Sequence, residues 1–161
     1  MEWLSRHAWW GLAAIAVLFA LFGVTDILSG AAADPAIATA LTGKSLSQLQ
    51  AEGGDAYQLY DFAVRQNGWT LMLVGGLLLA ILVFGFRRNQ RWAWWAMWAL
   101  PVWSVGVMVF FVVTGTEPSQ PPAPPMISGP IVAVVSAAIL LVSGPRFFGP
   151  PPPAKWIHLD T

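Results

Sequence analysis

Four long apolar stretches, separated by short polar segments, dominate the pattern of hydrophobic and polar positions along the chain. No Asp, Glu, Lys or Arg occurs in residues 7–25, 66–86, 92–116 or 118–145. A helix of about 20 apolar residues crosses a hydrocarbon core of about 30 Å. The pattern therefore predicts an all-α fold, a four-transmembrane-helix bundle forming one integral membrane domain over residues 1–161, with spans at about 9–28, 69–86, 92–114 and 126–142.

The first apolar stretch has two interpretations, a cleaved signal peptide or a retained membrane helix. Arg6 resembles the positively charged start of a signal peptide, and the alanines at 31–33 resemble a cleavage site. The apolar run over residues 9–28 is longer than the usual hydrophobic region of about 7–15 residues in a signal peptide. This length favours a retained helix.

The longest polar connection, residues 29–68, carries the signals of two short helices. Ser45 and Gln48 fit a capping box, and Asp55 follows a helix-breaking pair of glycines. In the second of these helices larger side chains share one face, namely Tyr57, Tyr60 and Val64. The Asn67-Gly68 pair is typical of a helix end before the second span. We therefore expect short amphipathic helices that form an extracytoplasmic cap; a partner-binding surface is the alternative.

Pairs of small residues inside the second and fourth spans predict where helices approach closely. Gly76 and Ala80 are four residues apart in the second span, and Ala133 and Ala137 have the same spacing in the fourth. Such pairs let the backbones of two membrane helices come together where no large side chain separates them. We expect both pairs to lie at helix–helix contacts.

Prolines predict a kink in the third span and the end of the fourth. Pro101 has no backbone N–H, so the helix is expected to bend near residues 97–101. Gly144 and Pro145 are typical of a helix end. Two further proline tracts, at 116–125 and 150–153, are expected to be extended spacers or, alternatively, docking ligands for aromatic grooves.

A basic turn between the second and third spans sets the predicted orientation in the membrane. Arg87, Arg88 and Arg91 lie in a short turn flanked by aromatic residues, as is typical where a chain leaves the bilayer. With both termini in the cytoplasm, six basic residues lie inside, namely Arg6, Arg87, Arg88, Arg91, Arg146 and Lys155, and two lie outside, Lys44 and Arg65. Because basic residues favour the cytoplasmic side, we predict cytoplasmic termini and a cytoplasmic proline-rich tail over residues 144–161.

Composition adds exclusions to this picture. Hydrophobic residues make up 57% of the 161 residues, charged residues make up 10%, and the formal net charge is zero. A chain without net positive charge offers little bulk attraction to nucleic acid, which we do not expect as a partner. The chain has no cysteine, which excludes disulfides, thiolate metal ligands and cysteine nucleophiles. The predicted partners are the lipid bilayer and other membrane-protein subunits.

Tryptophans mark the predicted membrane edges and one deeper candidate site. Six of them fall at the interfaces, as in an aromatic belt: Trp9, Trp10, Trp69, Trp92, Trp94 and Trp95. We take Trp92, Trp94 and Trp95, with the arginines of the basic turn, as topology anchors. Trp103 lies eleven residues past Trp92, roughly 16 Å deeper along a helix. A buried indole N–H needs an acceptor, so Trp98, Pro101 and Trp103 form a candidate site for a hydrophobic ligand; Ser104 or a carbonyl freed by the proline is the alternative acceptor.

Asp26 is the one acid attached to a predicted span. Ionisable residues inside a membrane are functional candidates, but Asp26 lies near the outer end of its span. This position favours an interfacial residue, paired with Arg65 or capping a neighbouring helix, over a proton or ion site. Arg65 also lies four residues after Asp61, the spacing of an ion pair on a helix. Asp26 and Arg65 are therefore a candidate polar site at the membrane edge.

Residues that carry catalysis or bind cofactors are sparse. The two histidines, His7 and His158, lie outside the apolar spans, which argues against haem ligation within the membrane. No pair of buried carboxylates, nucleophile motif or glycine-rich phosphate loop is present. We predict no catalytic residue, no metal site and no cofactor, and an enzyme is not favoured. Transport is poorly supported because no two spans are interrupted as a matched pair.

The basic turn running into Arg91-Trp92-Ala93-Trp94-Trp95, with Trp98 and Pro101 after it, resembles a pattern in small uncharacterised bacterial four-helix membrane proteins. This resemblance covers the second and third spans. It implies the bacterial cytoplasmic membrane and four helices, and it implies no activity and no functional residues. The favoured function is a non-catalytic accessory or scaffolding subunit of a membrane complex. The alternatives are a binder or carrier of quinone, lipid or pigment, and a subunit of a membrane redox enzyme whose cofactor lies on a partner.

Overall fold

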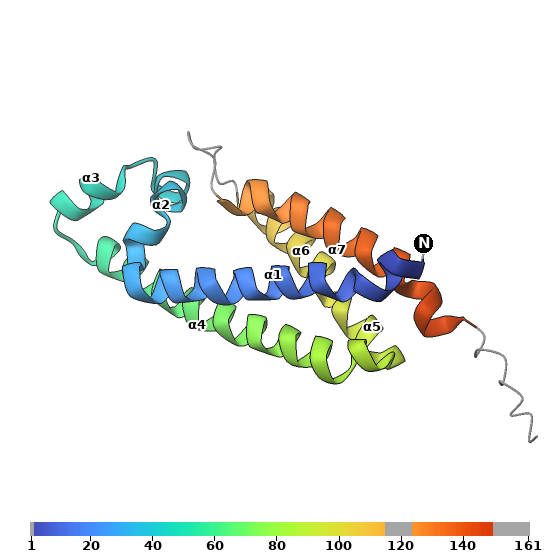
Figure 1. Ribbon diagram of the computed structural model, residues 1–161. Helices are drawn as coiled ribbons and strands as arrows, with labels where there is room; N and C mark the ends of the chain where they lie inside the picture. Colours follow the sequence, from blue (N-terminus) through green and yellow to red (C-terminus); the bar gives the residue numbers. More distant parts are fainter. Residues whose placement is uncertain (1, 115–123, 150–161) are drawn as a thin grey trace, which may run out of the picture.

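A computed structural model describes residues 2–114 and 124–149, and all regular structure in these two ranges is helical. In chain order the elements are α1 (Glu2–Ser29), η1 (Gly30–Ala33), α2 (Pro35–Thr42), α3 (Leu46–Ala51), α4 (Asp55–Phe84), η2 (Phe86–Arg88), α5 (Arg91–Met97), α6 (Ala99–Val113) and α7 (Pro124–Phe148) (Figure 1). The first proline tract lies outside the described residues up to residue 123, but Pro124 and Pro125 begin α7, so the prediction of an extended segment through residue 125 is wrong at its end. The tail from residue 150 also lies outside the described residues.

Four helical segments are long and apolar enough to cross a membrane. They are His7–Ala33, Asp55–Arg88, Arg91–Val113 and Met126–Phe148, with 27, 34, 23 and 23 residues. The predicted all-helical fold with four candidate spans is confirmed for the described part of the chain. The N-terminal end of α1, the turn η2, α5 and the C-terminal end of α7 gather at one end of the bundle, and η1, α2 and α3 lie at the other (Figure 1).

Helix α4 does not end where the sequence pattern predicted. It runs without a break from Asp55 through Asn67 and Gly68 to Phe84, so the predicted helix end at this pair is wrong. Gly68 serves a close contact with α1 instead. A Cβ on Gly68 would lie 2.6 Å from the carbonyl oxygen of Gly23, and a Cβ on Gly23 would lie 2.5 Å from that of Gly68. The two glycines let the backbones of α1 and α4 touch.

A second glycine contact corrects the predicted packing face of α4. A Cβ on Gly75 would lie 2.7 Å from the carbonyl oxygen of Ala16, whereas a Cβ on Gly76 would meet no atom within 4 Å. The prediction that Gly76 packs against a neighbouring helix is therefore wrong within this chain. Adjacent residues of a helix point about 100° apart, so only one glycine of the pair can face α1. In α7, the predicted packing residue Ala133 is buried.

The predicted kink at Pro101 is confirmed, and the predicted end of the fourth span is wrong. The third span divides at Trp98 into α5 and α6, because Pro101 cannot donate to the carbonyl of Met97. Helix α7, by contrast, continues through Gly144 and Pro145 to Phe148. A proline removes one helix hydrogen bond but does not oblige the helix to stop when neighbouring helices hold it.

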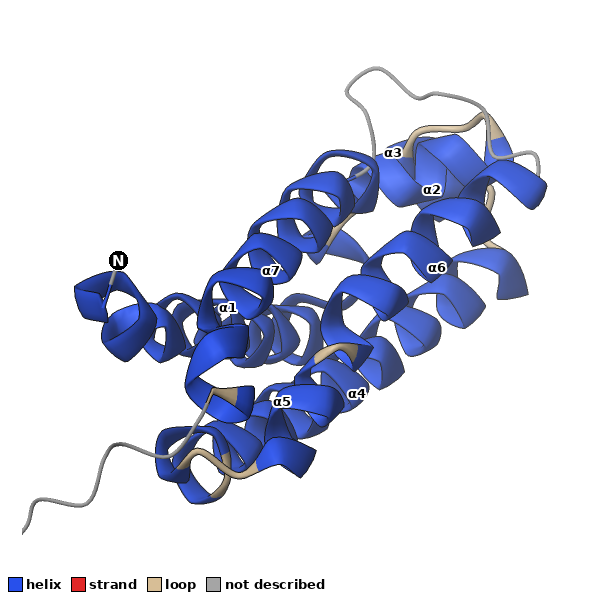
Figure 2. Ribbon diagram, turned by 90° about the vertical axis from the view of Figure 1, so that its right-hand side faces the viewer, coloured by secondary structure: helices blue, strands red, loops and turns tan. Residues whose placement is uncertain are grey.

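Large buried side chains concentrate at the end of the bundle that contains the basic turn. The main buried cluster is made of Leu12, Ala16, Leu78, Leu82, Phe86, Ala93, Trp94, Met97, Leu100, Leu140 and Phe147, from α1, α4, η2, α5, α6 and α7. Towards the other end, α1 and α4 stay in close contact, while α6 packs mainly against α7 (Figure 2). Buried hydroxyls in α6 and α7 bond back to their own helices, as Ser104 does to the carbonyl of Leu100 at 3.0 Å.

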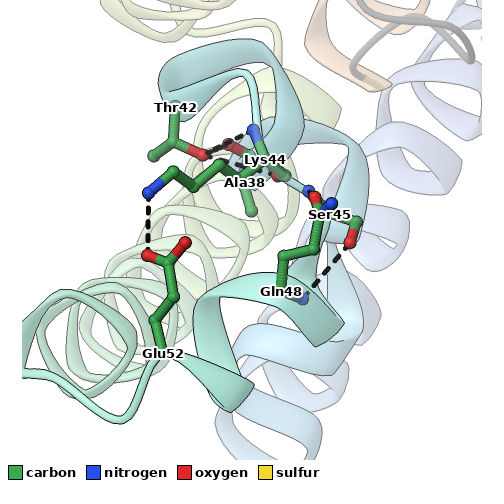
Figure 3. Close-up of polar contacts among 6 residues, drawn as sticks. All are labelled: Ala38, Thr42, Lys44, Ser45, Gln48 and Glu52. Carbon is green, nitrogen blue, oxygen red and sulfur yellow. Dashed lines mark hydrogen bonds and ion pairs between the residues drawn. The ribbon is translucent and has the colours of Figure 1, made fainter.

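The connection between α2 and α3 is a tight polar turn (Figure 3). Ser45 forms the predicted capping box, because its Oγ accepts from the Gln48 backbone N–H at 3.3 Å and its own N–H donates to Gln48 Oε1 at 2.8 Å. Lys44 Nζ pairs with Glu52 Oε2 at 2.7 Å. Leu49 is buried. These contacts join α2 to α3 through the turn.

Candidate functional site

The structure places the three residues of the predicted ligand site in different surroundings. Trp98 is half-buried at the break between α5 and α6, and Pro101 is buried one turn later. Trp103 is 46% exposed, and its ring lies edge-on to that of Phe19 in α1 with centroids 5.4 Å apart. Trp98 instead packs against Trp94, with centroids 5.6 Å apart. Trp98 and Trp103 thus sit beside different neighbours on the two sides of the kink.

The indole N–H of Trp98 has no hydrogen-bond partner among the described residues, although its nitrogen is buried. A buried donor without an acceptor is costly, by about 1–3 kcal/mol. Ser104, suggested as the acceptor for a deep indole, donates its hydroxyl to the carbonyl of Leu100, and its oxygen does not accept from Trp98. The N–H at the kink is therefore a buried donor that no described residue satisfies.

Trp94, one of the tryptophans expected at the membrane interface, packs between helices of the bundle. It is 8% exposed and donates its indole N–H to the carbonyl oxygen of Leu140 in α7 at 2.9 Å. Its ring also contacts Trp95 and Phe148 edge-on, with centroids 4.7 and 5.1 Å away. A signal for this burial exists in the sequence, because Trp94 lies three residues before Met97 and four before Trp98, on one face of a helix. Trp92 and Trp95 are exposed, as expected.

The predicted pairing of Asp26 with Arg65 is wrong. Asp26 Oδ2 accepts from the side-chain amide of Asn67 at 3.0 Å. Arg65 Nε pairs with Asp61 Oδ2 at 2.7 Å, which confirms the ion pair expected from their spacing. The continuation of α4 explains this result, because Asn67 is part of the helix and its side-chain amide lies beside Asp26 of α1, where it takes the place expected for Arg65.

The Asp61–Arg65 pair closes the C-terminal end of α1. The guanidinium of Arg65 donates to the carbonyl of Ile27, one of the last carbonyls of α1, and Asp61 Oδ1 accepts from the Ala31 N–H at 2.9 Å. Gly30 adopts a positive φ of 55°, and a Cβ there would lie 2.0 Å from Asp61 Oδ1. Only glycine fits this position, and the pair satisfies backbone groups that the helix end leaves unpaired.

Asp34 links this end to the start of α2. Its backbone carbonyl accepts from the Tyr60 hydroxyl, and its Oδ1 is buried without a hydrogen-bond partner among the described residues. Burial raises the pKa of Asp34 to about 6; the Ile37 backbone N–H offsets part of this rise, and the nearby Asp26 carboxylate adds to it. Asp34 is therefore a carboxyl group whose charge changes near neutral pH. With Asp26, Glu52, Asp55 and Asp61 it defines what we name the acidic end.

Four arginines define the opposite end, which we name the basic end: Arg87, Arg88, Arg91 and Arg146. Arg91 Nε donates to the carbonyl of Phe147 at 3.3 Å, and Arg146 Nη2 donates to that of Arg87 at 3.1 Å. These two bonds join the turn to the C-terminal end of α7 in both directions. Through these bonds the side chain of Arg91 and the backbone carbonyl of Arg87 hold the turn against α7.

No group of three or more His, Cys, Asp or Glu side chains within the described part of the chain is arranged to hold a metal ion. Comparison with known proteins gives no further guide, since no family model, curated protein or solved structure matches the chain.

Proposed function

We propose that this chain is a multi-pass protein of the bacterial cytoplasmic membrane that serves as a non-catalytic accessory or scaffolding subunit of a membrane complex. In this proposal both termini are cytoplasmic, and α2 and α3 form a cap on the extracytoplasmic side. The four long apolar helices support the membrane location. The separation of charge supports the orientation, because the basic end carries four arginines and the acidic end carries five carboxylates.

The subunit role is supported chiefly by an exposed face of helix α6. Over residues 105–113 its side chains are largely exposed, with Val109 and Phe110 at 54% and 64%. A Cβ on Gly106 would meet no atom within 4 Å, so a neighbouring helix could approach the backbone there. Helices in membranes associate by close packing rather than by a hydrophobic force. This face therefore suits a helix of a partner subunit.

Cysteine crosslinking tests the subunit role cleanly because the native chain has no cysteine. Val109→Cys places a thiol on the exposed face of α6, and Leu21→Cys, at 56% exposure on α1, is a matched control. In native membranes, we expect a short bifunctional thiol–amine crosslinker to join the protein to a different polypeptide at position 109 and much less at 21. A free monomer in mild detergent, or a crosslink only to a second copy, would contradict the proposal.

The orientation has its own test with a matched pair of glutamines. Gln50→Cys lies in α3 at the acidic end, and Gln90→Cys lies in the basic turn; both positions are exposed. A membrane-impermeant maleimide added to intact spheroplasts should label position 50 directly and position 90 only after permeabilisation. The reverse pattern would overturn the orientation, and equal labelling of both would overturn membrane spanning.

A second candidate function is the binding of a hydrophobic ligand at Trp98, Pro101 and Trp103. The unpartnered indole N–H of Trp98 favours it, since a quinone or lipid carbonyl would supply the missing acceptor. Organic extraction of purified protein followed by mass spectrometry should then recover a lipid-like species, with less recovered from Trp98→Phe. An absorption spectrum of the same sample tests the remaining alternative, a redox complex whose pigmented cofactor lies on a partner. A sample without bound species and without absorption beyond the aromatic residues removes both.

A further inference from the structure

Aromatic rings hold the arginines of the basic end in place. The guanidinium carbon of Arg87 lies 4.8 Å from the ring centroid of Trp9, and that of Arg91 lies 5.7 Å from that of Phe148. Arg88 lies 6.0 Å from the ring centroid of Phe84. A cation over an aromatic face is attracted by the ring's quadrupole, and contact with the ring leaves the edge of the guanidinium plane available for hydrogen bonds. The three positive groups are therefore partly ordered before any ligand arrives.

No described carboxylate lies within ion-pair distance of Arg87, Arg88 or Arg91. The two ion pairs among the described side chains, Lys44 with Glu52 and Arg65 with Asp61, both lie at the acidic end. Each guanidinium carries five N–H donors, and Arg91 uses Nε on the carbonyl of Phe147. Arg87 and Arg88 make no hydrogen bond to a described residue through their side chains, and both are exposed. The turn thus presents positive charge and many N–H donors that the fold leaves unsatisfied.

Exposed aromatic side chains surround the same turn. Phe84 and Trp92, on either side of it in the sequence, are 62% and 53% exposed, and Trp95 and Trp10 are 62% and 60% exposed. Aromatic rings of this kind settle at the boundary between headgroups and acyl chains of a bilayer. The basic end therefore combines donors for a phosphate with an apolar surface for the chains attached to it.

We propose that the basic end binds the headgroup of an anionic phospholipid, with its phosphate held by Arg87, Arg88 and Arg91. Arginine suits phosphate because its planar fork donates two parallel hydrogen bonds. Nucleic acid fits less well, since the exposed aromatic surface beside the turn matches acyl chains and the chain as a whole has no net positive charge. This inference rests on the membrane location in the proposed function and does not depend on a partner subunit.

Native mass spectrometry of the full-length protein in mild detergent tests the inference. Phosphatidylglycerol and phosphatidylcholine with the same acyl chains are titrated separately, and we expect tighter binding of phosphatidylglycerol. Arg88→Gln should weaken that binding about fivefold, the contribution of one arginine near an anionic headgroup, and the double variant Arg87→Gln with Arg88→Gln should weaken it further. Lys44→Gln removes one charge at the acidic end and is the matched control, expected to leave binding unchanged.

Several results would overturn the inference. Equal affinity for the two lipids, an unchanged affinity in Arg88→Gln, or the same loss in Lys44→Gln would each contradict a site at the turn. Complete displacement of phosphatidylglycerol by excess inorganic phosphate would show a site for free phosphate and not for a lipid. If Arg88→Gln fails to fold, the affinity of the native protein for phosphatidylglycerol is measured at low and at high ionic strength. An affinity that does not weaken at high ionic strength contradicts the site. Carbonate extraction of membranes tests the membrane location separately.

Discussion

The two ends of this bundle treat their charged residues in opposite ways. At the acidic end, the side chains of Asp61, Arg65 and Asn67 form hydrogen bonds inside the chain, and these bonds cap α1 and join it to α4. At the basic end, Arg87, Arg88 and Arg91 lie over aromatic rings and have no described carboxylate within ion-pair distance. Charge at the acidic end therefore stabilises the fold, whereas the exposed side chains of Arg87 and Arg88 remain available to a ligand outside the chain.

The two ends also differ in how their helices pack. Near the basic turn, large side chains such as Trp94, Leu140 and Phe86 fill the space between several helices. Towards the acidic end, α1 and α4 touch through backbone atoms at Gly23 and Gly68. Filling by side chains tolerates small adjustments, whereas backbone contact at glycine tolerates no added atom.

Removing the buried indole at the basic end should cost the most. We expect Trp94→Ala to lower the free energy of unfolding by about 3 kcal/mol, because it removes a packed ring and the bond to the Leu140 carbonyl. Trp95→Ala, at a 62% exposed neighbour, should cost much less. Unfolding in mixed micelles of increasing sodium dodecyl sulfate, followed by circular dichroism, measures both. Equal losses of unfolding free energy in the two variants would show that the buried ring of Trp94 stabilises the fold no more than the exposed ring of Trp95.

Adding one methyl group between α1 and α4 should come next. The Cβ that Gly75→Ala adds would lie 2.7 Å from the Ala16 carbonyl oxygen, so the backbones of α1 and α4 must separate. We expect a loss of about 1–3 kcal/mol, typical of overpacking. Gly76→Ala is the matched control and should be neutral or stabilising by up to about 1 kcal/mol, since alanine favours a helix. The same unfolding assay compares them, and a larger loss at position 76 would reverse the assigned packing face.

Breaking the polar contact at the C-terminal end of α1 should open the acidic end locally. In Asp61→Asn the ion pair with Arg65 is lost, and the acceptor of the Ala31 N–H is weakened. We expect hydrogen exchange at the Ala31 amide to become about tenfold faster, as in local opening without global unfolding. Glu52→Gln, which removes the exposed ion pair with Lys44, should leave that amide unchanged. No change in Asp61→Asn would show that α1 ends without help from this pair.

The smallest effect expected is a pH dependence at Asp34. Its pKa is about 6 in the folded chain against an ordinary value of 3.8, so the folded state binds the proton more tightly. The stability from this group is therefore fully present below pH 3.8, falls as the pH rises from there to about 6, and stays level above it. Melting temperatures of the purified protein from pH 4 to 8 should show this fall, and Asp34→Asn should flatten it. The exposed Asp55→Asn serves as the control.

The sequence pattern located the four apolar helices, the kink at Pro101, the capping box at Ser45 and the Asp61–Arg65 pair correctly. Each of these depends on residues within a few positions of one another, so local rules suffice. The predicted helix ends at Asn67-Gly68 and Gly144-Pro145 failed for the opposite reason. A glycine or proline weakens a helix by a few kcal/mol at most, and packing against neighbouring helices outweighs that cost.

The candidate site was harder to predict for a related reason. The depth argument concerned Trp103, yet the buried indole N–H without a described partner belongs to Trp98. Trp94, expected at the membrane interface, is only 8% exposed. Spacing indicates which residues share a helix face; it does not say which face meets another helix. The partner of Asp26 was likewise decided by a neighbour 41 residues away, the amide of Asn67.

The sequence by itself determined that four stretches are apolar enough to span a membrane, that positive charge clusters in one turn, and that acids lie in the long connection. Hydrophobicity and charge belong to each residue wherever it lies, so these properties can be counted along the chain. Only the tertiary structure decided that Gly75 and not Gly76 meets α1, that Trp94 is buried, and that the arginines lie over aromatic rings. Those outcomes depend on how helices rotate and approach one another, and a rotation of about 100° separates one residue of a helix from the next.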